Sequence, residues 1–257
     1  MNDLNDVTTF IEKSSRVTHY RELESLMVDV TKELGFNYYA LIHHVDLSRY
    51  SMDLQHMADG GLLALSNYPE SWIETYVERN IVANDPVLLA SQRTSVGFVW
   101  EDMGQLIKVT PVHHAIMEDS RRAGVAQGFT IPVNIPGEAN GSCAFAVRTG
   151  RALPVRNLPL AQLVGSFAFQ AARKLVLSAQ SSSLGQQRPL SERQLQCVTL
   201  VARGKSDWEI GRILGISEET VKRHLALARA HYDVPKRIQL VTRAIFEGQI
   251  ALADVLK

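Results

Sequence analysis

Apolar residues are arranged in two different patterns along the chain, and the first of these patterns predicts helices. In residues 23–34, LESLMVDVTKEL, apolar side chains recur every three or four positions, which is the pattern of a helix with one buried face. Gly35 directly follows this segment, and glycine is common at the end of a helix. The same reasoning predicts three further helices, at about residues 70–82, 112–123 and 158–177.

Other segments are short apolar runs bounded by turn residues, which predict strands. These runs occupy residues 36–45, 62–67, 128–135 and 141–148. Pro-Gly and Asn-Gly pairs separate the last two runs, so we expect those strands to pair as antiparallel neighbours. Strands interleaved with helices predict an α+β fold, in which residues 1–177 form an α-β-α sandwich around an antiparallel sheet. Such a sandwich has room for an apolar ligand between its layers.

A change in composition divides the chain. Residues 178–189, SAQSSSLGQQRP, are rich in Ser, Gln and Gly and are predicted to be a linker. Residues 190–257 then predict a second, all-α domain of four short helices. From Gly185 onward there are 12 Lys+Arg and 8 Asp+Glu, which leaves 15 of the 27 cationic and 19 of the 27 acidic residues in front. We therefore expect a polyanionic partner to meet only the rear domain.

Serine residues mark where three of the four rear helices begin. Ser191 with Gln194, and Ser206 with Glu209, have the spacing of a capping box, and Ser217 can cap the third helix. A Gly-Ile-Ser turn joins the second and third helices, which is the spacing of a helix-turn-helix. The sequence therefore predicts a DNA-binding motif in this domain.

The third helix of this domain has two different faces. Its apolar face is predicted to pack inward and consists of Val221, Leu225, Ala228 and Tyr232. Its outer face carries cationic and small residues, namely Lys222, Arg223, Ala226 and Arg229. Small residues let a helix approach base edges in the major groove, and cationic residues attract the phosphates. The alternative is that these charges form only a solvated face of a small bundle.

The segment LSERQ…ARGKSDWEIGRILGISEETVKRH resembles the DNA-binding domain of LuxR-type transcription regulators. The matching positions are Leu190, Arg193, Ala202, Gly204, Ser206, Glu209, Ile210, Leu214, Ile216, Ser217, Thr220, Val221 and His224. The resemblance implies that the protein binds double-stranded DNA as a homodimer at a palindromic site. The residues expected at the DNA are Lys222, Ala226 and Thr220, with Lys205, Arg223 and Arg229 near phosphates. Gln194 and Val198 depart from the family pattern, which usually has Glu and Leu there.

An unusual set of polar aromatics follows the second predicted strand. Tyr68, Trp72 and Tyr76 lie four residues apart, which places them on one face of a helix, and Asp85-Pro86 follows. With Trp100 and the segment GVAQGFTIPV, this stretch resembles the acyl-homoserine-lactone-binding domain of the same regulators. The matching positions are Tyr68, Trp72, Tyr76, Asp85, Pro86, Trp100, Gly128, Thr130 and Pro132.

This second resemblance implies a set of ligand contacts that the residue chemistry can supply. Trp72 offers only a donor, which suits the lactone carbonyl, and Asp85 as a carboxylate suits the amide N–H. Tyr68 can donate to the acyl carbonyl, while Tyr76 and Trp100 would pack against the acyl chain and the ring. Family members often carry Ser or Thr on the last strand at the position of Ala144, and Ser142 lies two residues before it, on the same strand face. An unusual acyl group or a different ligand therefore remains an alternative.

Each of these residues also has a purely structural interpretation. Trp100 can fill a core, Asp85 can cap the helix that follows, and a regulator that binds DNA without a diffusible signal remains possible. We expect dimer contacts from the helix at 158–177, with a second contact from Ile238, Val241 and Ile245.

Several classes of function lack support in the sequence. The pairs His43-His44 and His113-His114 have no further ligand at metal-binding spacing, so no metal is expected. The sequence has no phosphate loop and no nucleophile motif, so we expect no catalytic residue and no cofactor other than the small-molecule ligand. The N-terminus does not resemble a signal peptide and no apolar run is long enough to span a membrane, which predicts a cytoplasmic protein with two free thiols, Cys143 and Cys197.

Overall fold

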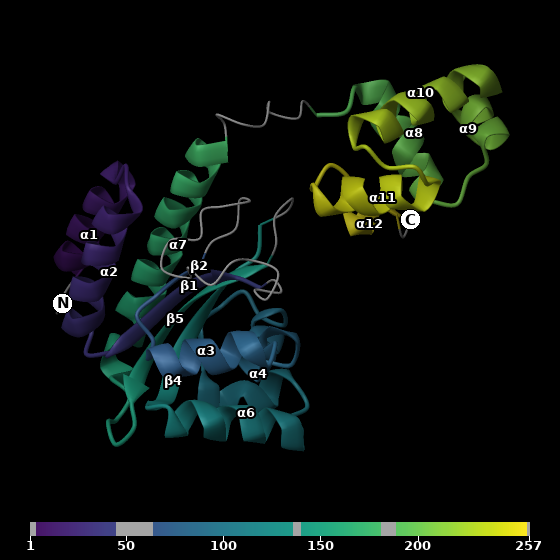
Figure 1. Ribbon diagram of the computed structural model, residues 1–257. Helices are drawn as coiled ribbons and strands as arrows, with labels where there is room; N and C mark the ends of the chain where they lie inside the picture. The colour runs from purple at the N-terminus through teal and green to yellow at the C-terminus, as the bar shows by residue number, and fades with distance from the viewer. Residues whose placement is uncertain (1–3, 45–63, 136–139, 181–188, 256–257) are drawn as a thin grey trace. The chain divides into compact units, whose positions relative to one another are not determined.

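The computed structural model describes residues 4–44, 64–135, 140–180 and 189–255 (Figure 1). The chain divides into two compact units, whose described parts are treated separately below. The helix predicted to end at Leu177 continues to Gln180, so the predicted linker begins within a helix. The rest of that linker, residues 181–188, lies outside the described residues. So do the last residue of the strand predicted at 36–45 and the first two residues of the strand predicted at 62–67.

The first unit is built on a five-stranded sheet in the order β2-β1-β5-β4-β3, and each neighbouring pair is antiparallel. The strands are β1 (Tyr38–His43), β2 (Ala64–Ser66), β3 (Phe98–Val99), β4 (Val125–Val133) and β5 (Gly141–Arg148). The predicted hairpin is present as β4 and β5, which pair from Val125 with Arg148 to Val133 with Gly141. The predicted antiparallel sheet is therefore confirmed.

Helices cover both faces of this sheet, as Figure 1 shows. One layer consists of α1 (Leu4–Arg16), α2 (Tyr20–Glu33) and α7 (Leu158–Gln180). The opposite layer consists of α3 (Glu70–Glu78), α4 (Pro86–Ser91), α5 (Met103–Leu106) and α6 (Pro111–Arg122). Short 3₁₀ turns occur at Ile81–Ala83, Trp100–Asp102 and Val155–Asn157. The three layers confirm the predicted α-β-α sandwich, although helix α1 was not predicted.

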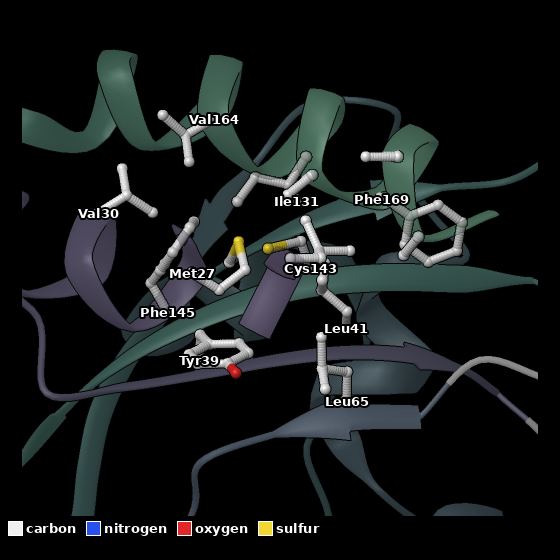
Figure 2. Packing of buried hydrophobic residues seen from close by; sticks show 14 of the residues in the cluster. Met27, Val30, Tyr39, Leu41, Leu65, Ile131, Cys143, Phe145, Val164 and Phe169 are labelled. Carbon is white, nitrogen blue, oxygen red and sulfur yellow. The ribbon is translucent and has the colours of Figure 1, made fainter. Parts of the chain in front are cut away.

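The alternation of side chains along the strands creates two different cores. Tyr39, Leu41, Cys143 and Phe145 point toward α2 and α7, where they pack with Met27 in a dense apolar cluster (Figure 2). The residues between them point to the opposite face, toward α3, α4 and α6. Those residues on β1 and β5 are Ala40, Ile42, Ser142, Ala144 and Ala146. Four of these five are small, so the second core is filled less completely than the first.

One predicted helix is shorter than expected. The segment predicted as a helix at 70–82 forms α3 only as far as Glu78, because Asn80 adopts a left-handed backbone conformation with φ of 46°. Asparagine is one of the few non-glycine residues that enter this region readily. The chain then makes a 3₁₀ turn and leads into Asp85, at the start of α4. The break therefore sets the position of Asp85 relative to α3.

The second unit contains the four predicted helices. They are α8 (Glu192–Ala202), α9 (Asp207–Leu214), α10 (Glu218–His231) and α11 (Arg237–Phe246). Ser191, Ser206 and Ser217 cap α8, α9 and α10 as predicted, and the first two form complete capping boxes. Gly215 ends α9 with φ of 68°, which favours glycine. A short fifth helix, α12 (Leu252–Val255), packs against α8 and was not predicted.

The apolar face predicted on the fourth of these helices is wrong in part. Ile238 is 68% exposed, but Val241 is buried in the core of the unit and Ile245 packs against that core. The buried face of α11 is instead formed by Leu240, Val241 and Ala244. Val241 is therefore not available for the second dimer contact.

Two further properties concern the described residues as a whole. Among them, no helix has the length and apolar character needed to cross a membrane. Both cysteines are free and buried, Cys143 in the first unit and Cys197 in the second.

Candidate functional site

A cavity lies between the sheet and the helices α3, α4 and α6. Its volume is about 110 Å³, measured as the space open to the centre of a water-sized sphere. One buried water needs only about 10–15 Å³ of such space, so this cavity is large enough for a small organic molecule. The lining residues are Ala40, Ile42, Leu65, Ser66, Tyr68, Trp72, Ile73, Tyr76, Val77, Asp85, Val87, Leu88, Trp100, Ile116, Met117, Ser120, Ser142 and Ala144. All six residues predicted to bind the ligand are among them.

The cavity exists where small residues on the sheet face large aromatic residues that border it. A Cβ atom at Gly128 would lie 2.5 Å from the ring of Trp100 and 2.8 Å from the carbonyl oxygen of Phe145. Only glycine therefore allows the indole to approach β4 this closely. The indole N–H of Trp100 donates to the hydroxyl of Thr130 over 2.9 Å, which fixes the ring beside the cavity.

Asp85 is the most constrained polar group at the cavity. One carboxylate oxygen accepts from the backbone N–H of Val87 at 2.8 Å and so caps α4. The other oxygen accepts from the hydroxyl of Tyr76 at 2.6 Å. Burial raises the pKa of Asp85, against the opposite effect of these two hydrogen bonds. The structural role predicted as the alternative is thus present, and each oxygen keeps a further lone pair for another donor.

Three other polar side chains at the cavity have no hydrogen-bond partner among the described residues. These are the indole N–H of Trp72 and the hydroxyls of Tyr68 and Ser66, all on residues that line the cavity. Trp72 is only 6% exposed. Burial, and then the nearby Asp85 carboxylate, raises the pKa of Tyr68, so this hydroxyl stays protonated. The lining of the cavity therefore includes three donors without a partner and one buried carboxylate that can accept.

The structure also brings together two polar residues that the sequence did not connect. The hydroxyl oxygen of Ser142 lies 2.8 Å from Nε2 of His44. Ser142 is 3% exposed and lines the cavity next to Ala144, on the same face of β5. The sequence identified Ser142 by its spacing from Ala144, but nothing in it indicated His44, which is 98 residues away.

In the second unit, α9 and α10 form the predicted helix-turn-helix. The predicted inner face of α10 is confirmed, because its four residues are all buried, namely Val221, Leu225, Ala228 and Tyr232. On its outer face, Lys222, Arg223 and Ala226 are exposed. Lys222 forms an ion pair of 2.8 Å with Glu218 one turn earlier.

The other predicted DNA-binding residues are partly engaged within the unit. Thr220 forms hydrogen bonds with Ser217 at the N-terminus of α10, and Arg229 donates to the carbonyl of Pro235 at 3.2 Å. Lys205 lies 3.9 Å from Glu209. Thr220, Lys205 and Arg229 are each half-buried.

The described residues contain no group of three or more His, Cys, Asp or Glu side chains that could hold a metal ion. The candidate sites are the cavity in the first unit and the helix-turn-helix in the second.

Comparison with known families supports this division. Residues 20–172 match the autoinducer-binding domain, and residues 188–244 match the luxR family of bacterial regulatory proteins. The chain belongs to the LuxR-type regulators. A LuxR-type regulator of this kind is a quorum-sensing transcription regulator and not an enzyme, as the sequence predicted.

Relatives of this LuxR-type regulator match it over most of its length. The transcriptional activator protein LuxR of Aliivibrio fischeri is 25% identical and covers 95% of this chain and 94% of its own. The quorum sensing-dependent regulator RpaR of Rhodopseudomonas palustris is 30% identical over 74% of this chain and 76% of its own. Among solved structures, Escherichia coli SdiA in complex with octanoyl-rac-glycerol has a TM-score of 0.69 at 23% identity, over 96% of this chain and 97% of that one. This similarity supports the two-domain fold.

Proposed function

We propose that this LuxR-type regulator is a receptor for an acyl-homoserine lactone, which it binds in the cavity beneath α3. The observation that carries the proposal is the set of polar groups at the cavity. Trp72 and Tyr68 offer donors without partners, and Asp85 offers a buried acceptor that α4 and Tyr76 hold in place.

These groups match the polar atoms of the ligand one for one. An acyl-homoserine lactone has a ring carbonyl, an amide N–H and an acyl carbonyl, and each costs roughly 1–3 kcal/mol if it is buried without a partner. Trp72 would donate to the ring carbonyl, Tyr68 to the acyl carbonyl, and the amide would donate to Asp85. Trp100 would pack against the ring, and Tyr76 against the start of the chain. Ala144 would contact the ligand without a hydrogen bond.

The proposed response couples this ligand to DNA through folding and dimerisation. Ligand bound only by the folded domain stabilises that domain by mass action. Leu163 and Phe167 on α7 are 38% and 42% exposed and lie on one face of the helix, which suits contact with a second copy. A dimer would set two α10 helices on the half-sites of a palindrome in cytoplasmic DNA. Lys222, Ala226 and Thr220 would lie at base edges, with Arg223, Arg229 and Lys205 near phosphates.

A second candidate is a regulator that responds to a different ligand or to none. The solved complex of SdiA holds an acylglycerol, and Ala144 lacks the hydroxyl that the family pattern often has on the last strand. Both candidates predict DNA binding, so only ligand measurements distinguish them.

The test is a thermal melt of the full chain with a panel of acyl-homoserine lactones and with octanoyl-glycerol. Saturation at about 100 times the Kd adds about 2.7 kcal/mol, which raises the Tm of a unit of this size by roughly 5–10 °C. We expect this increase with at least one lactone, and sedimentation of that complex as a dimer. A Tm that responds to no lactone would reject the receptor, and a response to the glycerol ester alone would favour the second candidate.

A further inference from the structure

An open groove lies between α1 and α2, in the helical layer on the other side of the sheet from the lactone cavity. Its volume is about 630 Å³, measured in the same way as that of the cavity. Ligand sites in proteins commonly have volumes of about 300–1,000 Å³. The apolar part of the lining is Val17, which is buried, and Leu26, which is half-buried. The groove therefore has room for a small organic molecule with an apolar part.

Four side chains that can donate hydrogen bonds also line this groove, two from each helix. Lys13 and Arg16 lie one turn apart on α1, and Arg21 and Ser25 lie one turn apart on α2. All four are exposed, and none of these side chains has a hydrogen-bond or ion-pair partner among the described residues. The groove therefore presents three positive charges and one hydroxyl to which no acceptor is bound.

The acidic residue in the lining, Glu22, is held away from these charges. Its carboxylate accepts from the backbone N–H of Thr18 at 2.9 Å and lies 3.4 Å from the hydroxyl of the same residue. The hydrogen bond from the backbone of Thr18 lowers the pKa of Glu22, so the carboxylate is ionised near pH 7. Three cations and one carboxylate leave the lining with a net charge of +2.

Helix dipoles account for two of the cations but not for the third. Lys13 and Arg16 lie in the last turn of α1, where positive charge is favourable. In the same turn Lys174 donates to the carbonyl of Ser15 at 3.0 Å. Arg21 lies in the first turn of α2, where positive charge is unfavourable, and no side chain caps that N-terminus. The stability of α2 therefore does not explain Arg21, whereas an anion bound in the groove would.

The groove suits a phosphate group better than other anions. A phosphate ester carries about 1.5 to 2 negative charges and three acceptor oxygens in one compact group, and a guanidinium can bind two of those oxygens at once. The rest of the unit is acidic, since residues 1–184 contain 15 Lys+Arg and 19 Asp+Glu. A DNA duplex or a long acidic peptide would meet these acidic residues, whereas a compact phosphate meets only the groove.

We propose that the groove between α1 and α2 binds a small organic phosphate, such as a nucleoside diphosphate. The donors of the two helices contact the phosphate oxygens from opposite sides, and the organic part covers Val17 and Leu26. An anion held by both helices ties α1 to α2, so it stabilises the first unit whether or not a lactone is bound. The site lies apart from the lactone cavity and does not rest on the proposed function.

The test is titration calorimetry of the full-length protein without lactone, at about 150 mM salt, with inorganic pyrophosphate and with ADP as probes. We expect both probes to bind with a Kd below about 1 mM. One hydrogen bond to a charged group corresponds to a change in Kd of about tenfold or more. Arg21→Ala is therefore expected to weaken both probes by at least about this factor. Its urea midpoint without phosphate is expected to equal or exceed that of wild type.

Two further variants serve as controls. Arg151→Ala removes an exposed cation of the same unit outside the groove, and Arg223→Ala removes an exposed cation from the outer face of α10. Both are expected to bind the probes as wild type does. A purely structural role for Arg21 would lower the urea midpoint of Arg21→Ala and leave its affinity for the probes unchanged. Equal losses of affinity in Arg21→Ala and Arg151→Ala would show only a general attraction to positive charge and would contradict the site.

Three results would overturn the proposal. If wild type binds neither pyrophosphate nor ADP at about 10 mM, the groove is not a phosphate site. If binding is lost in Arg223→Ala and kept in Arg21→Ala, the probes bind the helix-turn-helix instead. If a DNA duplex of random sequence binds through Arg21 more tightly than ADP does, the partner of the groove is nucleic acid. None of these results affects the lactone receptor, because no lactone is present in the titration.

Discussion

The hydroxyl of Tyr76 donates a hydrogen bond of 2.6 Å to the carboxylate of Asp85 across the break between α3 and α4. Because the other carboxylate oxygen caps α4, the proposed acceptor is oriented by two of the three helices that border the cavity. A substitution at Asp85 is therefore expected to change both ligand binding and the packing of α3 and α4, because the same carboxylate oxygens serve both.

Replacement of Asp85 by Asn tests the acceptor. Asparagine is as good a helix N-cap as aspartate, so we expect the unfolding free energy without ligand to fall by no more than about 1 kcal/mol. The loss of one charged acceptor for the amide is worth about 1.5–3 kcal/mol, which weakens lactone binding more than tenfold. Calorimetry and urea unfolding measure the two effects. Unchanged affinity would show that Asp85 is only a cap.

The two cavity tryptophans are expected to respond in opposite ways to the same substitution. Trp72→Phe removes a donor that has no partner in the free protein, so its main effect is a threefold to tenfold loss of lactone affinity. Trp100→Phe leaves the buried hydroxyl of Thr130 without its donor, so its main effect is a loss of about 1–3 kcal/mol in the unfolding free energy of the free protein. Equal effects of the two variants on both measurements would contradict the assigned hydrogen bonds.

Gly128 is predicted to be irreplaceable because of the ring that lies on it. Gly128→Ala places a Cβ atom 2.5 Å from Trp100 and 2.8 Å from a backbone oxygen, so we expect a loss of about 1–3 kcal/mol and weaker ligand binding. Gly104→Ala on α5 is the control, since no atom lies within 4 Å of the added Cβ. Denaturation midpoints compare the two. A Gly128→Ala protein as stable as wild type would mean that Trp100 does not lie on β4.

His44 gives the first unit a pH-dependent stability. The pKa of the folded histidine, about 4, is below its ordinary value of 6.5, so between these values the unfolded chain binds a proton that the folded chain does not. The contribution of the neutral His44 ring to the unfolding free energy is therefore complete above pH 6.5, and it is lost as the pH falls toward 4. We expect wild type to lose about 2 kcal/mol more than His44→Phe between pH 7.5 and pH 5.

Urea unfolding of both proteins at the two pH values measures this difference. A His44→Phe protein with the same pH dependence as wild type would show that the buried ring does not titrate as described.

The exposed face of α10 is predicted to supply the contacts with DNA. Lys222→Ala should weaken operator binding and leave lactone affinity unchanged, since the residue lies in the other unit. If Lys222 contacts a phosphate, the slope of log K against log salt falls by about 1, whereas a base contact instead relaxes sequence preference by about 1–3 kcal/mol. Arg243→Ala is the control, because Arg243 lies on α11, outside the helix-turn-helix, and its ion pair with Glu247 matches that of Lys222 with Glu218. Equal losses in both variants would argue against α10 as the recognition helix.

Local signals in the sequence predicted where helices begin and end more accurately than they predicted which residues are buried. Ser191, Ser206 and Ser217 were found as caps because a cap is decided within four residues. The stripe on α11 predicted as a dimer contact is wrong in part, because Val241 is buried in the core, and periodicity cannot tell an exposed apolar residue from a buried one. Helix α1 was not predicted at all, although Val7 and Phe10 pack in the core.

The cavity was predictable only as far as its residues lie close together in the sequence or match a family pattern. A short stretch of sequence that matches the family pattern contains Tyr68, Trp72, Tyr76 and Asp85. The structure places these residues around one cavity. The contact between His44 and Ser142 depends on the register of β1 against β5, which no local pattern specifies. Asp85 both caps α4 and accepts a hydrogen bond from Tyr76, and this combination likewise could not be predicted without the fold.

The most direct test of the lactone receptor is mass spectrometry of small molecules extracted from the purified protein after expression with a panel of acyl-homoserine lactones. We predict that wild type retains one lactone in about a one-to-one ratio, and that Asp85→Asn retains much less of it. Wild type that is folded, binds DNA and retains no lactone from the panel would contradict the account.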